Sequence, residues 1–69
     1  MTNDTTAPTT VFIEMTPVAW EYEFKVINTK TGELVFEPLT GSNEEAAWKN
    51  LRVIMKQLNY DVVAEIRHP

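Results

Sequence analysis

The amino-acid sequence predicts an α+β domain: a three- to four-stranded antiparallel sheet in the order (β)-β-β-α-β, with one helix packed on one face. Two neighbouring stretches alternate apolar with polar residues around a glycine-containing turn, which is typical of a β-hairpin. A third stretch repeats apolar residues at helical spacing behind a capping signal, and a fourth stretch alternates again. These observations predict one helix and at least three strands.

The hairpin is predicted over residues 20–37. Apolar residues occupy the even positions from 20 to 26 and charged residues lie between them, so the first strand buries one face. The second strand, 33–37, alternates in the same way after the turn at 30–32. Pro38 ends it, because proline has no backbone N–H to donate to a sheet.

The length of the turn sets the register of this hairpin. A three-residue loop pairs Val26 with Phe36, so that both faces agree, and it places Gly32 where a bulge needs a positive φ. A four-residue loop would set Phe24 opposite Glu37 and mix apolar with charged residues on the inner face. The three-residue loop is therefore preferred.

The helix is predicted to begin at Ser42, after a turn at Thr40 and Gly41, and to end at Asn59. Ser42 with Glu45 three residues later forms a capping box, in which each side chain accepts a hydrogen bond from an orphan backbone N–H. Apolar residues then recur at helical spacing over about four turns. Asn59 suits a helix stop because asparagine tolerates the left-handed conformation.

The last strand, 61–67, alternates again. A right-handed crossover through the helix would place it antiparallel beside the first hairpin strand, so that the first hairpin strand lies in the middle. Residues 11–15 are predicted as an extra edge strand. The threonine-rich residues 1–10 are interpreted as a disordered tail, which leaves 11–69 as a single α+β domain.

The inward-facing apolar side chains of these elements form a small predicted core. A domain of this size has about 3–5 kcal/mol of net stability, so a dimer would supplement it. The predicted core residues are Trp20, Tyr22, Phe24, Val26, Leu34, Phe36, Ala47, Leu51, Ile54, Leu58, Val62, Ala64 and Ile66.

Composition narrows the class of protein. The 69 residues suffice for one domain, and the absence of cysteine favours the reducing cytoplasm over an oxidising compartment. No apolar run approaches the roughly 20 residues that a membrane span requires. A net charge of -4 repels phosphate, which disfavours nucleic acid as a partner.

Residue types that carry catalysis are scarce. His68 is the single histidine and lies next to the C-terminus, and Ser42 is already explained as a helix cap. Gly32 and Gly41 are isolated, so neither a phosphate-binding loop nor a dinucleotide fingerprint is predicted. We therefore expect a protein that is not an enzyme and that uses no cofactor.

Acidic residues are predicted to gather on the outer face of the sheet, and these are Glu21, Glu23, Glu37 and Glu65. An open sheet offers no cage of oxygens for a metal ion, and Lys25 is predicted to pair with Glu37. We expect no metal site, and the acids form either a solvated face or a docking surface.

One face of the helix carries basic residues beside an aromatic side chain. Steps of about 100° per residue place three of them on one stripe, next to Trp48 and Met55 at the edge of the buried face. The three are Lys49, Arg52 and Lys56. Charged stripes are usually only solvated, but Trp, Met and Arg are also enriched in binding hot spots.

The favoured hypothesis is a small non-enzymatic interaction module, an adaptor or inhibitor such as viruses and mobile elements encode at this size. It would dock on a larger protein through the edge of the helix or through the acidic outer face of the sheet. The alternative is a nucleic-acid-binding module that uses the basic stripe. A homodimer through the outer sheet face is also considered, because Ile27, Val35 and Val63 line up there. The candidate partner-binding residues are Trp48, Lys49, Arg52, Met55, Lys56, Glu21, Glu23, Glu37 and Glu65.

Overall fold

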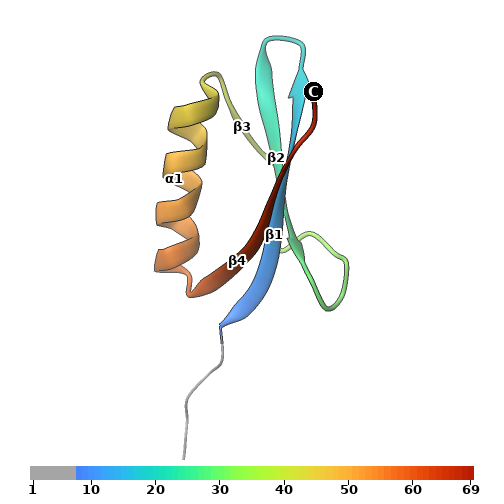
Figure 1. Ribbon diagram of the computed structural model, residues 1–69, viewed down its shortest axis with the longest axis vertical. Coiled ribbons are helices and arrows are strands. Elements are labelled where there is room, and N and C mark those ends of the chain that lie inside the picture. Colours follow the sequence, from blue (N-terminus) through green and yellow to red (C-terminus); the bar gives the residue numbers. More distant parts are fainter. Residues whose placement is uncertain (1–7) are drawn as a thin grey trace, which may run out of the picture.

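A four-stranded mixed sheet carries one helix on one face (Figure 1), which confirms the α+β class. The computed structural model describes residues 8–69, and residues 1–7 of the expected tail lie outside the described part. The elements are β1 (Thr9–Val18), β2 (Glu21–Asn28), β3 (Leu39–Gly41), α1 (Glu44–Gln57) and β4 (Tyr60–Arg67).

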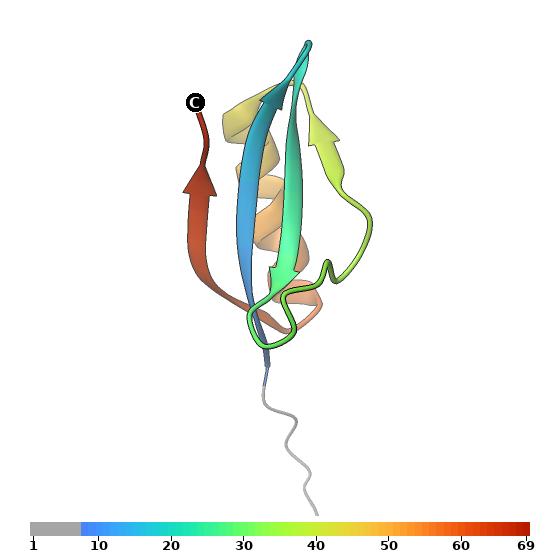
Figure 2. The same ribbon diagram turned by 90° about the vertical axis from the view of Figure 1, so that its right-hand side faces the viewer.

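The strands lie in the order β3-β2-β1-β4, as Figure 2 shows from the side of the sheet that faces away from α1. The β1–β2 and β2–β3 pairs are antiparallel, which agrees with the predicted antiparallel sheet, but β4 is parallel to β1. Strand β3 also includes Thr40 and Gly41, where a turn into the helix was predicted. The last strand was predicted to lie antiparallel beside the first hairpin strand. This prediction was wrong, because β1 lies between β2 and β4.

Strand β1 is central rather than an extra edge strand. Its side chains Val11, Ile13 and Met15 are all buried beneath α1. Pro17 does not prevent this placement: the backbone oxygen of Met15 accepts a hydrogen bond from His68 on the β4 side, and Pro17 faces the same side beyond the end of β4. Because no partner strand is present there, no N–H is needed.

The loop after β2 contains four residues, not the predicted three. The backbone N–H of Asn28 donates to the oxygen of Glu33 over 2.9 Å, and Ile27 pairs with Leu34. The side-chain oxygen of Asn28 accepts hydrogen bonds from the next turn amides, which stabilises the longer loop. Gly32 has a φ of 75°, which confirms the expected positive value.

The predicted second hairpin strand at 33–37 is reduced to this single bridge. After it the chain leaves β2 and returns as β3, which pairs Phe24 with Leu39 instead of Glu37. The mismatch that argued against a four-residue loop is therefore avoided by a change of register. The alternation of apolar and polar residues does not indicate where the chain leaves β2 and changes register.

The helix begins one residue later than predicted. Asn43 is the N-cap, and its side-chain oxygen accepts a hydrogen bond from the backbone N–H of Ala46 over 3.0 Å. At the other end Asn59 adopts a φ of 60°, which confirms the expected left-handed stop.

Replacing Asn43 with alanine is expected to destabilise the domain by about 1 kcal/mol, because the cap hydrogen bond to the first turn is lost. Ser42→Ala is the matched control and should change the free energy of unfolding by less than about 0.5 kcal/mol. Urea unfolding followed by circular dichroism measures both. A larger cost at Ser42 would restore the predicted capping box.

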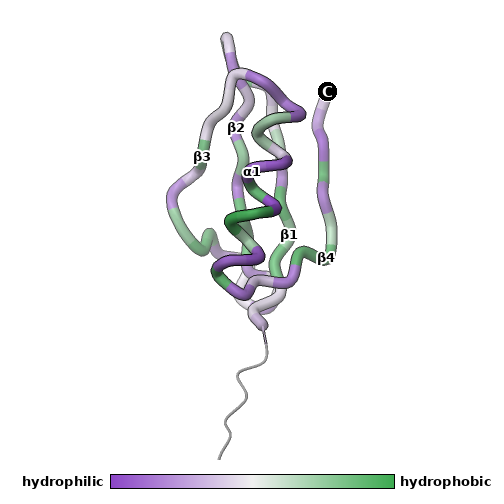
Figure 3. Tube along the Cα trace, turned by 90° about the vertical axis from the view of Figure 1, so that its left-hand side faces the viewer, coloured by the Kyte–Doolittle hydropathy of each residue, from purple (hydrophilic) through white to green (hydrophobic). Residues whose placement is uncertain are grey.

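The core lies between α1 and the central strands β1 and β2. In Figure 3, seen from the helix side, α1 runs in front of these two strands while β4 lies to one side. The fully buried side chains are Val11, Ile13, Met15, Phe24, Val26, Trp48, Leu51 and Met55. Partly buried residues packed against them include five of the predicted core, Tyr22, Phe36, Ala47, Ile54 and Val62.

Five predicted core residues are exposed instead: Trp20, Leu34, Leu58, Ala64 and Ile66. Trp20 is 92% exposed because it lies in the two-residue turn between β1 and β2 rather than in a strand. Leu34 lies in the irregular segment after β2, and Leu58 caps the end of α1.

A bulge in β4 accounts for Ala64 and Ile66. The register with β1 shifts after Val62, so that Phe12 pairs with Ala64 and Val63 is the extra residue. From this point the alternation is inverted: Ala64 turns away from α1, while Glu65 turns toward it.

The face of the sheet opposite α1 is not covered by any other element of residues 8–69 (Figure 2). Within the same residues, no helix has the length and apolar character needed to cross a membrane.

Candidate functional site

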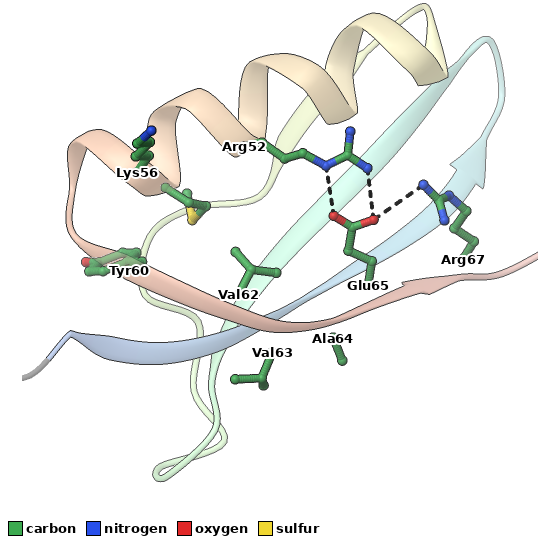
Figure 4. A pocket seen from close by; sticks show the side chains of 9 residues that line it. Arg52, Lys56, Tyr60, Val62, Val63, Ala64, Glu65 and Arg67 are labelled. Atoms are coloured by element: carbon green, nitrogen blue, oxygen red, sulfur yellow. Dashed lines mark hydrogen bonds and ion pairs between the residues drawn. The ribbon is translucent and has the colours of Figure 1, made fainter.

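A groove of about 620 Å³ runs between α1 and β4 (Figure 4). The helix contributes Arg52, Met55 and Lys56 to its wall. Strand β4 contributes Tyr60, Val62, Val63, Ala64, Glu65 and Arg67. The groove therefore combines an apolar floor, formed by Met55, Tyr60 and Val62, with three basic residues and one acid.

Local structure places the charged side chains in this groove. Arg52 and Lys56 are four residues apart on α1 and so project on the same side, one turn from each other. The bulge at Val63 turns Glu65 and Arg67 toward the helix, where a regular strand would have turned them to the outer face. The bulge thus assembles the site.

A chain of ion pairs connects helix and strand. The Arg52 guanidinium donates two hydrogen bonds to the Glu65 carboxylate, each over 3.1 Å (Figure 4). Arg67 lies 3.4 Å from the same carboxylate and pairs with Glu44 over 3.2 Å. The hydrogen bonds to Glu65 and the charge of its carboxylate raise the pKa of Arg52.

Both arginines lie over the indole ring of Trp48. The guanidinium carbon of Arg67 is 4.6 Å from the ring centroid and that of Arg52 is 5.9 Å away, distances typical of cation–π contacts. The same ring packs edge-to-face with Phe24, with the two centroids 5.3 Å apart. Trp48 is only 2% exposed, so a partner would contact the arginines and not the indole.

The ion pairs connect the helix wall of the groove to its strand wall, but they leave both arginine side chains about half exposed. The side chain of Arg67 is 47% exposed, and that of Arg52 is more exposed still. Exposed pairs of this kind contribute little to stability. The charged groups of both arginines are therefore accessible to solvent beside the groove.

The outer edge of β4 is open. The N–H of His68 donates to Met15 on β1, so the backbone groups of Arg67 and Glu65, which alternate with it, point away from β1. No strand within residues 8–69 pairs on that side. The groove thus runs along a sheet edge with unpaired backbone donors and acceptors.

The groove brings together four of the predicted site residues, Arg52, Met55, Lys56 and Glu65. The others lie elsewhere: Trp48 beneath the arginines, Lys49 toward the N-terminal part of the helix, Glu21 and Glu23 on β2, and Glu37 in the loop before β3. The prediction of Glu65 on the outer sheet face was wrong, because the bulge inverts its orientation.

Sequence reasoning missed Arg67, Tyr60 and Val62 as groove residues. Their place depends on the bulge and on the parallel pairing of β4. The one available signal is the doubled apolar pair Val62 and Val63, which interrupts strict alternation and is compatible with an extra residue.

The uncovered sheet face carries a second apolar surface. The register aligns Ala64, Phe12, Ile27 and Leu34 in a row across the strands. The predicted row contained Ile27 with Val35 and Val63; the four-residue loop instead leaves Val35 against the core, and Val63 is the bulge residue.

Charged residues bound this row. Lys25 is paired in register with Glu14 on β1, not with Glu37 as predicted from the three-residue loop. Glu14 also contacts the imidazole of His68 over 2.9 Å. His68 is therefore held on the sheet rather than free at the chain end.

No group of three or more potential metal ligands occurs within residues 8–69. Comparison with protein-family models, curated proteins and solved structures finds no match. The function is therefore argued from the groove itself.

Proposed function

We propose that this chain is a small non-enzymatic interaction module, an adaptor or inhibitor, that docks on a larger protein through the groove between α1 and β4. One observation carries the proposal: an open strand edge lies beside an apolar groove whose basic residues are exposed and only loosely paired. The absence of cysteine supports the cytoplasm as the place where it acts.

A protein partner fits this surface better than nucleic acid. The basic stripe offers three positive charges, and one of them, Arg52, shares its charge with Glu65. Nucleic-acid affinity grows with the number of phosphates neutralised, and so few bases on a chain of net charge -4 supply little of it. An apolar floor cannot pair with the charged phosphates of a nucleic acid, whereas it can bury apolar side chains of a peptide.

Affinity capture with matched charge variants tests the proposal. The groove variant combines Lys56→Glu with Arg67→Glu, and the control combines Lys30→Glu with Lys49→Glu, which makes the same charge change outside the groove. A partner should be retained by the unmodified chain and by the control but lost by the groove variant. Circular dichroism verifies that both variants are folded.

Two results would contradict the proposal. Equal capture by the groove variant would move the interface to the outer sheet face, where a partner or a second copy would meet the row that includes Phe12 and Ile27. Retardation of DNA or RNA in a low-salt gel, abolished by Lys49→Glu, would favour the nucleic-acid alternative.

A further inference from the structure

We propose that the groove receives an extended segment of a partner protein, apolar in its middle and acidic at both ends, which adds to β4 as a fifth strand. This inference rests on the proposed function and specifies the ligand that the groove takes.

The open edge provides the backbone half of the recognition. Glu65 and Arg67 direct their backbone N–H and C=O groups away from β1, and β4 is the last strand of the sheet. An extended peptide laid along this edge pairs with those groups, which is the mode called β-augmentation. The bulge at Val63 restricts regular pairing to the C-terminal half of β4.

The apolar half of the recognition lies on both sides of β4. An added strand sends alternate side chains to opposite faces of the sheet. On the outer side they would meet Ala64 and Ile66. On the helix side they would meet Tyr60 and Val62 before the bulge, and Glu65 and Arg67 after it. Around Val62 and Ala64 the side chains on both sides are apolar, so the middle of the segment is apolar.

Basic residues lie at both ends of the groove, where they would contact the two ends of the segment. Figure 4 places Lys56 beside Tyr60 at one end of the groove and Arg52 with Arg67 at the other. Lys56 makes no ion pair with any residue between 8 and 69. At the opposite end Glu65 shows the chemistry that the arginines accept, a carboxylate held by charge-assisted hydrogen bonds.

Acids that flank an apolar middle are attracted to the basic residues of this groove. A second copy of this chain would bring Asp61 and Glu65 as well as Arg67 on its own β4. Self-association is therefore an outcome of the test: shifts of the amide resonances of residues 64–67 with protein concentration, in the absence of peptide, would assign the added strand to a second copy and overturn the proposal.

The test is a titration of ¹⁵N-labelled protein with synthetic peptides, followed by NMR. The probe is the acetylated, amidated octapeptide Asp-Asp-Val-Ile-Val-Ile-Asp-Asp. One control peptide replaces each Asp with Lys, and the other places Pro at the fifth position, which removes a backbone donor and breaks strand pairing. The probe should shift the amide resonances of residues 64–67 and slow amide exchange at Glu65 and Arg67, and neither control should.

Two protein variants test whether the probe peptide binds in the groove. Lys56→Glu should weaken binding of the probe about tenfold, whereas Lys49→Glu, the same change on the same helix outside the groove, should alter it less than about twofold. Both variants change exposed residues, and their folding is verified from the same spectra.

Three results would overturn strand addition: no shifts with millimolar probe, equal binding of the proline peptide, or shifts confined to the outer face around Phe12. If a cellular partner is nevertheless lost by the groove variant, the proposed function survives and only the strand mode is rejected. If the probe binds along β4 but no partner depends on the groove, the proposed function is the one that fails.

Discussion

Replacing Trp48 with alanine is expected to leave the domain largely unfolded at room temperature. The side chain is 2% exposed and connects the sheet, through Phe24, with the two arginines of the groove. Removing a buried tryptophan costs about 3–5 kcal/mol, because a large apolar contact is lost and a cavity remains. A domain of this size has about that much stability in total.

The second tryptophan provides a matched control for the same substitution. Trp20 is 92% exposed in the turn between β1 and β2, so Trp20→Ala should change the free energy of unfolding by less than about 0.5 kcal/mol. Thermal and urea unfolding by circular dichroism measure both variants. Similar losses at the two positions, or a larger loss at Trp20, would contradict the arrangement of β1, β2 and α1.

Replacing Ile13 with alanine is expected to cost about 2–5 kcal/mol, because Ile13 is fully buried at the middle of the central strand. Ile66→Ala removes the same atoms from β4 but should cost only about 1 kcal/mol. Ile66 is 38% exposed on the outer face, so water already covers part of its side chain.

The comparison of the two isoleucines tests the bulge directly. If β4 alternated regularly after Val62, Ile66 would be buried beneath α1 and would cost as much as Ile13. Urea unfolding of the two variants distinguishes these cases, since the expected difference exceeds the error of the method. Equal losses of stability in the two variants would contradict the bulge in β4, and they would also contradict the placement of Arg67 in the groove.

Features that depend on local chemistry could be predicted from the sequence. Helical spacing identified α1, alternation identified β2 and β4, and the positive φ values at Gly32 and Asn59 followed from the residue types. Each of these depends on a short stretch of chain whose preferences agree with its surroundings.

Features that depend on partners distant in sequence could not be predicted. The central place of β1 follows from parallel pairing with β4, and nothing local to residues 9–18 indicates it. The exposure of Trp20 follows from a turn that an alternating pattern reads as strand. In each case tertiary pairing overrode the local pattern.

The candidate site was predicted only in part, for the same physical reason. Arg52 and Lys56 follow from helical periodicity, which is insensitive to distant contacts. Arg67 requires an inverted alternation, because one extra residue turns every later side chain to the other face. The basic helix stripe was therefore found without the strand residues that complete the groove.

The parallel pairing of β1 with β4 also has a consequence for how the chain folds. The β1–β2 hairpin closes from neighbouring residues, but pairs such as Thr9 with Tyr60 require nearly the whole described chain to return on itself. Such distant closures are slow, so this step is expected to limit the folding rate. During synthesis the hairpin leaves the ribosome well before β4, and until β4 arrives one side of β1 is available to chaperones or to other nascent chains.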